Sequence, residues 1–134
     1  MNEALRHPIR VRYHECDPQG IVFNANYLAY FDMAITELWR PLGGYAEMVE
    51  SGTDIVVAEA VVRYLAPLRF DEEIDLVVRG VRLGKTSITT ELAVERNSQS
   101  AAEGQIRHVF VDADGAPTEM PASVRAGLEP FALA

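Results

Sequence analysis

One carboxylate in this sequence lies in a setting that could support chemistry on a carbonyl group. Asp17 directly precedes a proline, and Gly20 follows in the same turn, within residues 13–27. The proline favours an extended backbone at Asp17, and the glycine permits a turn that a side chain would oppose. Asn24 and Asn26 then offer oxygens to cap a following helix. A carboxylate that faces the unpaired N–H groups of a helix start can act on a carbonyl. The structural alternative is that Asp17 only caps or turns the chain.

A long helix is expected directly after this turn, over residues 26–40. Apolar residues recur there at spacings typical of one helix face, and they are Leu28, Phe31, Ile35, Leu38 and Leu42. A proline and a glycine pair then end the pattern. The length and apolar content of this helix place it deep in the fold.

The remaining sequence predicts mainly strands, and short polar turns join the later ones. The alternating and β-branched patterns cover residues 8–14, 54–66, 73–83, 87–96 and 101–111. Short helices are also expected near residues 45–50 and 121–128. Consecutive strands with short turns must be antiparallel, and one sheet face needs a cover that only the 26–40 helix can supply. We therefore predict one α+β domain over residues 1–134, a curved five-stranded sheet around a central helix.

Composition and charge exclude several classes of function. A net charge of −8 argues against a nucleic-acid surface. Apolar runs stay below the roughly 18 residues that a membrane span needs. A single cysteine fits a reducing cytoplasm. The three histidines lack the spacing of a metal site, so we expect no metal.

Three stretches resemble one known family. The first is Tyr13-x-Glu15-Cys16-Asp17-Pro18-x-Gly20-Ile21-Val22-x-x-x-Asn26-Tyr27, the second runs over residues 64–74, and the third over residues 84–87. Together they resemble the 4-hydroxybenzoyl-CoA thioesterase family, which has the hotdog fold. The resemblance covers about residues 8–112.

This resemblance implies hydrolysis of an acyl-CoA thioester to a free carboxylic acid and CoA. Asp17 would be the nucleophile or general base, and the backbone N–H at Asn24 would receive the oxyanion. Residues expected to contact the substrate are Gly20, Ile21, Val22, Tyr27, Lys85, Thr86 and Ser87. CoA is part of the substrate, so no separate cofactor is implied. Many relatives carry histidine or tyrosine where this chain has Asn24, which leaves the acyl group open.

The resemblance also implies an assembly, because relatives pair their sheets across a two-fold axis. A homodimer or homotetramer is therefore expected, with sites between protomers. The main alternative function is a non-catalytic module that binds CoA or acyl-carrier-protein ligands. A dehydratase is disfavoured, because the sequence offers no clear Asp/His pair.

Several single residues have rival interpretations. Cys16 could suggest thiol chemistry, but no histidine is assigned as its base. His14 is more simply a surface or interface residue than a general base. Asp32 could contact substrate from within the helix or be a solvated carboxylate. Glu59, in an apolar strand, is expected to pair with Arg63 on the same face.

Overall fold

A computed structural model describes residues 3–42 and 44–134 of the chain. The strands are β1 (Leu5–Arg10), β2 (Asp54–Tyr64), β3 (Glu73–Leu83), β4 (Ser87–Arg96) and β5 (Gln99–Val111). The α-helices are α1 (Asn26–Trp39), α2 (Gly44–Glu50) and α3 (Ala122–Leu128). Three short 3-10 helices are η1 (Tyr13–Glu15), η2 (Arg40–Leu42) and η3 (Glu129–Phe131). No helix among these described residues is both long and apolar enough to cross a membrane.

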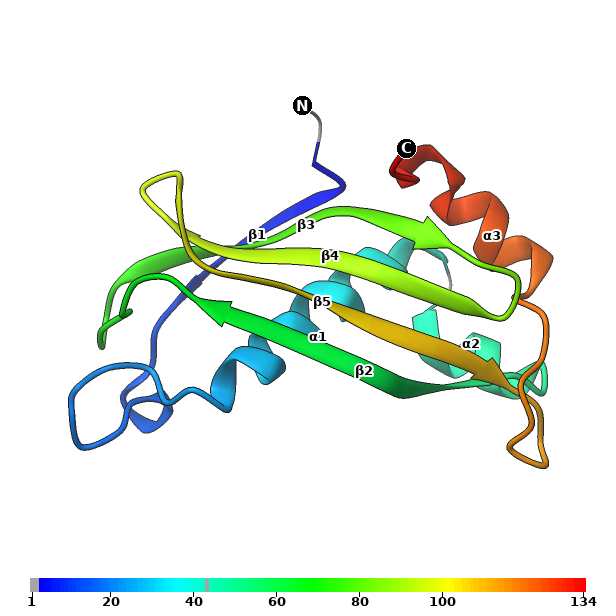
Figure 1. The fold of residues 1–134 in the computed structure, drawn as a ribbon, viewed down its shortest axis with the longest axis horizontal. Coiled ribbons are helices and arrows are strands. Elements are labelled where there is room, and N and C mark those ends of the chain that lie inside the picture. Colours follow the sequence, from blue (N-terminus) through cyan, green and yellow to red (C-terminus); the bar gives the residue numbers. More distant parts are fainter. Residues whose placement is uncertain (1–2, 43) are drawn as a thin grey trace.

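The strands form one antiparallel sheet in the order β1-β3-β4-β5-β2, and α1 lies across one of its faces (Figure 1). This confirms the predicted five-stranded sheet with a long helix packed on it. The first strand is displaced from the prediction of 8–14. It ends at Arg10, and Tyr13–Glu15 forms the 3-10 turn η1 instead. Pro8 is tolerated inside β1 because β1 is an edge strand.

Helix α1 supplies the centre of the core. Its buried residues are Tyr27, Tyr30, Phe31, Ala34, Ile35, Leu38 and Trp39. The prediction that Leu28 joins this stripe is wrong, since Leu28 is 41% exposed and Tyr27 takes the buried position. The two aromatic rings Trp39 and Phe110 stack at 6.2 Å, which connects the end of α1 to β5. The apolar face of α1 thus fixes where its N-terminus lies relative to the sheet.

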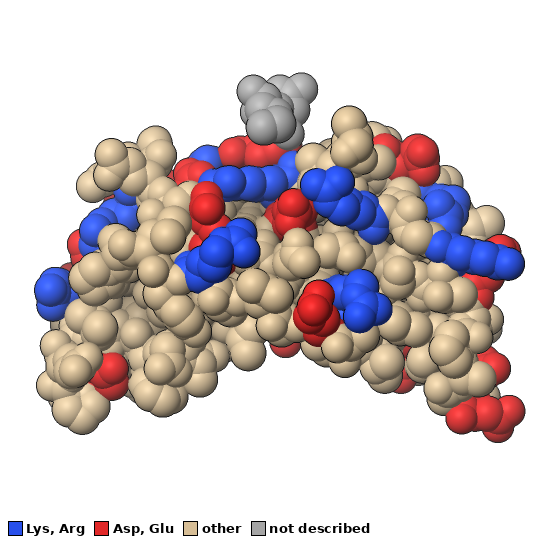
Figure 2. All heavy atoms as spheres, in the orientation of Figure 1, with Lys and Arg blue, Asp and Glu red and all other residues tan. Residues whose placement is uncertain are grey.

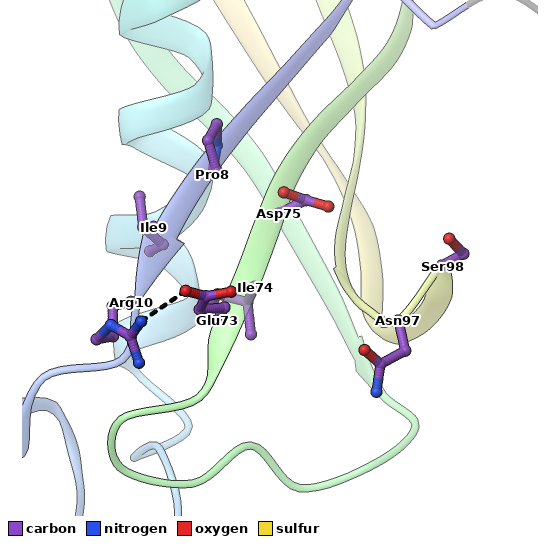
Figure 3. A pocket seen from close by; sticks show the side chains of 8 residues that line it. All are labelled: Pro8, Ile9, Arg10, Glu73, Ile74, Asp75, Asn97 and Ser98. Carbon is purple, nitrogen blue, oxygen red and sulfur yellow. Dashed lines mark hydrogen bonds and ion pairs between the residues drawn. The ribbon is translucent and has the colours of Figure 1, made fainter.

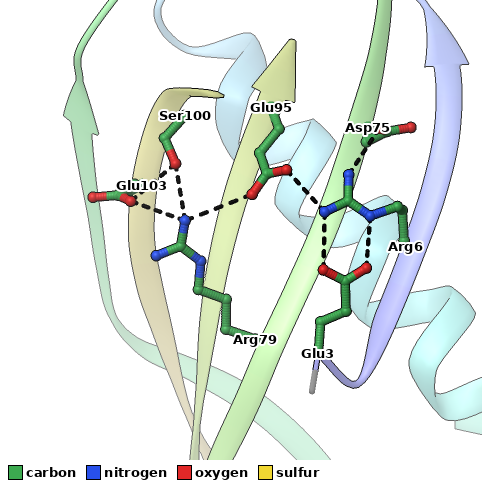
Figure 4. Close-up of polar contacts among 7 residues, drawn as sticks. All are labelled: Glu3, Arg6, Asp75, Arg79, Glu95, Ser100 and Glu103. Atoms are coloured by element: carbon green, nitrogen blue, oxygen red, sulfur yellow. Dashed lines mark hydrogen bonds and ion pairs between the residues drawn. The ribbon is translucent and has the colours of Figure 1, made fainter. Parts of the chain in front are cut away.

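The outer face of the sheet carries charges instead of an apolar layer. Arg6 pairs with Glu3, Asp75 and Glu95, and Arg79 pairs with Glu103 and Glu95 (Figure 4). Acidic and basic side chains are interspersed over this side of the molecule (Figure 2). Glu59 lies opposite Arg107 of β5 in the strand register, and Arg63 lies opposite Glu103. The expected Glu59–Arg63 pair is not formed among the described residues, and Glu103 is paired with Arg79 instead.

The two edges of the sheet differ. Edge strand β1 is short and contains a proline, both of which discourage pairing with another strand. Edge strand β2 has eleven residues, and Val56 and Val57 on it are 48% and 56% exposed. A long apolar edge of this kind is normally covered in a native assembly.

We predict that Gly104→Ala strongly destabilises the fold. A Cβ at Gly104 of β5 would lie 1.9 Å from the carbonyl oxygen of Val61 and 3.0 Å from Cε2 of Phe31. Backbone must move to admit it, which should lower the free energy of unfolding by roughly 3 kcal/mol. Gly115→Ala is the matched control, because Gly115 has open space around it and a φ of +80°. Its strain should cost only about 1 kcal/mol. Equal losses in urea unfolding would contradict the packing argument.

We predict that acid weakens the fold through His108. Burial lowers the pKa of His108 on β5, and the carboxylate of Asp32 only partly opposes this shift. The folded state therefore holds His108 neutral, whereas the unfolded chain takes up a proton below its ordinary pKa of about 6.5. Stability from this residue is complete above that pH and is lost as the pH falls. Melting temperatures between about pH 8 and pH 5 should fall less steeply in His108→Leu than in the wild type. An equally steep fall of melting temperature with pH in both proteins would refute the role of His108.

Candidate active site

The loop after η1 holds Asp17 in a closed turn. The Asp17 N–H donates to Ile21 O at 2.9 Å, and the Gly20 N–H donates to Asp17 O at 2.9 Å. Gly20 has a φ of +79°, a conformation that side chains disfavour, so the turn needs glycine there. Asp17 Oδ1 accepts the Gln19 N–H at 2.8 Å. These bonds orient the carboxylate within its own loop.

Backbone contacts fasten this turn to the β2–β3 connection. Ile21 bridges to Arg69, and the Val22 N–H donates to Leu68 O at 2.8 Å. Leu68 is fully buried, and Val22 is 3% exposed. The second motif recognised in the sequence therefore supports the first one directly.

The start of α1 is left uncapped. Its first non-helical residue, Ala25, makes no side-chain cap hydrogen bond, and the first turn has no acidic residue. The expectation that Asn24 or Asn26 caps the helix is wrong, because Asn26 Nδ2 instead donates to Glu15 O at 2.7 Å. Within residues 3–42 and 44–134, the N–H groups of Asn24 and Ala25 donate to no protein acceptor. Free N–H groups at a positive helix end suit a negatively charged oxygen.

Tyr64 is a site residue that sequence reasoning did not single out. It ends β2, and its hydroxyl donates to Asn24 O at 3.0 Å. The rings of Tyr27 and Tyr64 meet edge to face with centroids 5.2 Å apart. Burial, with Tyr64 nearby, raises the pKa of Tyr27 to about 12, so Tyr27 stays neutral. The only sequence signal for Tyr64 was its place in the second motif.

One cleft of about 550 Å³ brings these parts together. Its lining residues are Asp17, Gln19, Ile21, Val22, Asn24, Tyr27, Tyr64, Leu65, Ala66 and Pro67. Five of the predicted site residues therefore share one cleft. Gly20 shapes the loop without lining it. Asp17, which has a carboxylate, and Asn24, which has a free N–H, thus border one largely apolar space.

The structure keeps the turn at residues 84–87 away from this cleft. Strand β3 separates the two places, and its eleven residues span roughly 35 Å at about 3.3 Å each. The turn is fixed at the other end of the sheet, where Met120 N–H donates to Lys85 O and Phe110 N–H to Thr86 O. Arg125 also donates to Gly84 O there. Within one chain, therefore, Lys85, Thr86 and Ser87 do not meet Asp17.

Other candidates near Asp17 are less suited to chemistry. Burial, with Glu15 and Asp17 nearby, raises the pKa of the Cys16 thiol and keeps it protonated. His14 is exposed on η1, not on a strand as expected. Asp32 is exposed on α1. No group of three or more metal-ligating side chains occurs in the described part of the chain.

A second cleft, between β1, β3 and the β4–β5 turn, is polar, and its charged side chains are held in ion pairs. Arg10 bonds Glu73 across it, as Figure 3 shows. Asp75, on its wall, is paired with Arg6. The remaining polar side chains are Asn97 and Ser98 of the turn. The charged side chains of this cleft are thus all held in ion pairs, so the Asp17 cleft is the candidate site.

Comparison with known proteins identifies the family of this chain. Residues 11–128 match the family model of the thioesterase-like superfamily. Acyl-CoA thioester hydrolase YbgC of Escherichia coli is 32% identical over 116 residues, covering 84% of this chain and 86% of that protein.

Two crystal structures are also similar. One is a thioesterase complexed with coenzyme A and Zn from Thermus thermophilus, with a TM-score of 0.84 and 30% identity. The match covers 96% of this chain and 94% of the Thermus thermophilus chain. The other is a hypothetical protein from Aquifex aeolicus, with a TM-score of 0.87, 28% identity, and coverage of 92% and 98%. The chain therefore belongs to the thioesterase-like superfamily and is a thioester-hydrolysing enzyme of the hotdog fold.

Proposed function

We propose that this enzyme hydrolyses acyl-CoA thioesters, with Asp17 as nucleophile or general base. The observation that carries the proposal is one cleft lined by both Asp17 and Asn24. The N–H of Asn24, and that of Ala25 next to it in the chain, donate to no protein acceptor among the described residues. A thioester needs an attacking group on one side of its carbonyl and hydrogen-bond donors on the other. The similarity to an acyl-CoA thioester hydrolase and to a coenzyme A complex supports CoA as the thiol.

Two routes use the same residues. In the first, the Asp17 carboxylate attacks the thioester carbonyl, the CoA thiolate leaves and takes a proton, and water cleaves the resulting anhydride. In the second, Asp17 takes a proton from a water that attacks the carbonyl directly. In both, the carbonyl oxygen becomes negative and accepts bonds from the Asn24 and Ala25 N–H groups. The uncapped helix end stabilises that charge.

The apolar part of the cleft receives the acyl group in this proposal. Ile21, Val22, Leu65 and Pro67 offer aliphatic walls, and Tyr27 offers an aromatic one. Both aromatic and aliphatic acyl groups suit such a lining, so a panel of acyl-CoA substrates should define the preference. Independence from metal stays a prediction, to be tested by assay in the presence of a chelator.

Asp17→Asn should lower kcat by about 10²–10⁴-fold, because an amide can neither attack nor accept the proton. Thiol release from the acyl-CoA panel measures this. Asp114→Asn, in the exposed turn after β5, is the matched control and should keep full activity. Full activity in Asp17→Asn would refute the role of Asp17.

The two routes can be separated in heavy-oxygen water. A single turnover that leaves label in the Asp17 side chain would require the anhydride, whereas label only in the acid product would favour direct water attack. Calorimetric CoA binding without any turnover would instead support the non-catalytic binding module.

We further propose that a second copy pairs along β2 and completes the site. The exposed edge of β2 offers unpaired backbone groups beside Val56 and Val57. Tyr64 at one end of β2 borders the cleft, and Asp54 at the other end pairs with Val111, near the 84–87 turn. Antiparallel pairing about a two-fold axis would bring each partner's turn to the other's cleft. Lys85 would then meet the CoA phosphates.

Mixing two impaired variants tests this shared site. Lys85→Ala should raise KM roughly 10-fold by loss of a charged contact. When it is refolded together with Asp17→Asn, mixed dimers carry one intact site, so about one quarter of the wild-type activity should return at low substrate. Recovery no greater than the sum of the separate variants would refute the shared site. Sedimentation of each sample verifies the dimer.

A further inference from the structure

Glu15 is an unusual residue for its position. It is 8% exposed, and among the described residues, aromatic residues Tyr and Trp aside, the only other buried polar side chains are Thr90 and His108. Carboxylates are seldom buried unless they are well bonded, because removal from water costs free energy. Glu15 does not line the Asp17 cleft, so it has no direct access to a substrate there.

The side chain of Glu15 clamps the loop to α1. Its Oε1 accepts the Tyr30 hydroxyl at 2.9 Å and the Arg12 N–H at 2.8 Å. Burial and this bond raise the pKa of Tyr30, which keeps the phenol protonated as a donor. Tyr30 is 1% exposed and packs against Tyr27. One carboxylate oxygen therefore joins the end of the first strand segment to the buried face of the helix.

The main chain of Glu15 holds the predicted oxyanion donors from both sides. Its carbonyl oxygen accepts the Phe23 N–H at 2.9 Å and Asn26 Nδ2 at 2.7 Å. Phe23 and Asn26 directly flank Asn24 and Ala25, whose N–H groups remain free. Asp17 follows Glu15 by two residues. Both halves of the proposed chemistry are thus attached to this one residue.

We propose that Glu15, through its bond to Tyr30, is a positioning residue that sets the distance between the Asp17 carboxylate and the N–H groups of Asn24 and Ala25. This inference rests on the proposed function for its catalytic consequence. The clamp is rigid because Tyr30 belongs to the core and not to the loop. Without it, the loop keeps its internal turn but loses its fixed register on α1.

Three variants test this role. Glu15→Ala removes the acceptor of both bonds, and Tyr30→Phe removes one donor. Each should lower kcat by about 10- to 100-fold while KM stays within about twofold, since misplacement affects the reacting groups more than CoA binding. Glu15→Gln keeps an amide oxygen for the same two donors and should recover most of kcat. Thr90→Val, which removes a buried hydroxyl without a partner on β4, is the control and should keep kcat.

Hydrogen exchange gives a readout independent of activity. In Glu15→Ala, the amides of residues 16–26 should exchange faster than in the wild type, whereas those of residues 118–128 should exchange at the wild-type rate. In Thr90→Val, neither range should exchange faster. Unchanged kcat in folded Glu15→Ala, or a Glu15→Gln as impaired as Glu15→Ala, would overturn the proposal. Faster exchange over the whole chain would also overturn it, as a general loss of stability. If the wild type hydrolyses no acyl-CoA, the proposed function fails, and local exchange still decides whether Glu15 positions the loop.

Discussion

The packing of one helix across the sheet is the constraint on which the rest of this molecule depends. Helix α1 buries Tyr27, Tyr30, Phe31 and Leu38 against strands far apart in the sequence. Burial of large side chains of this kind contributes about 1.5–3 kcal/mol each. Because this packing fixes the position of α1 on the sheet, the N-terminus of α1 always lies at the same point beside β2. The motif loop only has to reach this point to place a carboxylate there.

Polar contacts at the start of α1 then shape the candidate site that the core packing has positioned. The uncapped first turn of α1 gives up the stability that a capping side chain would add, about 1 kcal/mol. The free N–H groups lie just before this turn, at Asn24, which lines the cleft, and at Ala25. Asn26, a residue suited to capping, bonds Glu15 O instead. The site is therefore slightly less stable than the sequence allows, as is common where backbone groups must stay available.

Much of the fold follows from patterns along the chain. The helix over residues 26–40 and the four later strands were predictable, because their apolar periods and short turns act locally. The end of β1 was not, since Tyr13–Glu15 turns only because its partners Phe23 and Tyr30 lie elsewhere in the sequence. Leu28 was wrongly assigned to the buried face of α1, because the spacing of apolar residues along a helix does not show where the sheet that covers them ends. Strand order is also a long-range property that no local period contains.

The candidate site was predictable to a similar degree. The motif around Asp17 indicated the loop, and the resemblance indicated Asn24, Tyr27 and Lys85. Tyr64 was missed because its hydroxyl reaches a backbone oxygen forty residues earlier, a contact without a sequence pattern. The distance between Asp17 and Lys85 likewise depends on the direction of β3, which only the assembled sheet reveals.

The charged outer face of the sheet has a consequence for how this protein behaves in a crowded solution. Arg6 contacts carboxylates from three different segments, and Arg79 connects β3 to β4 and β5 (Figure 4). Covering these ions with another protein would strip water from each, at several kcal/mol per ion before any contact repays it. This face of the sheet is therefore a poor place for nonspecific adhesion. Contact with another protein is therefore more favourable at the exposed valines of edge strand β2 than on this charged face.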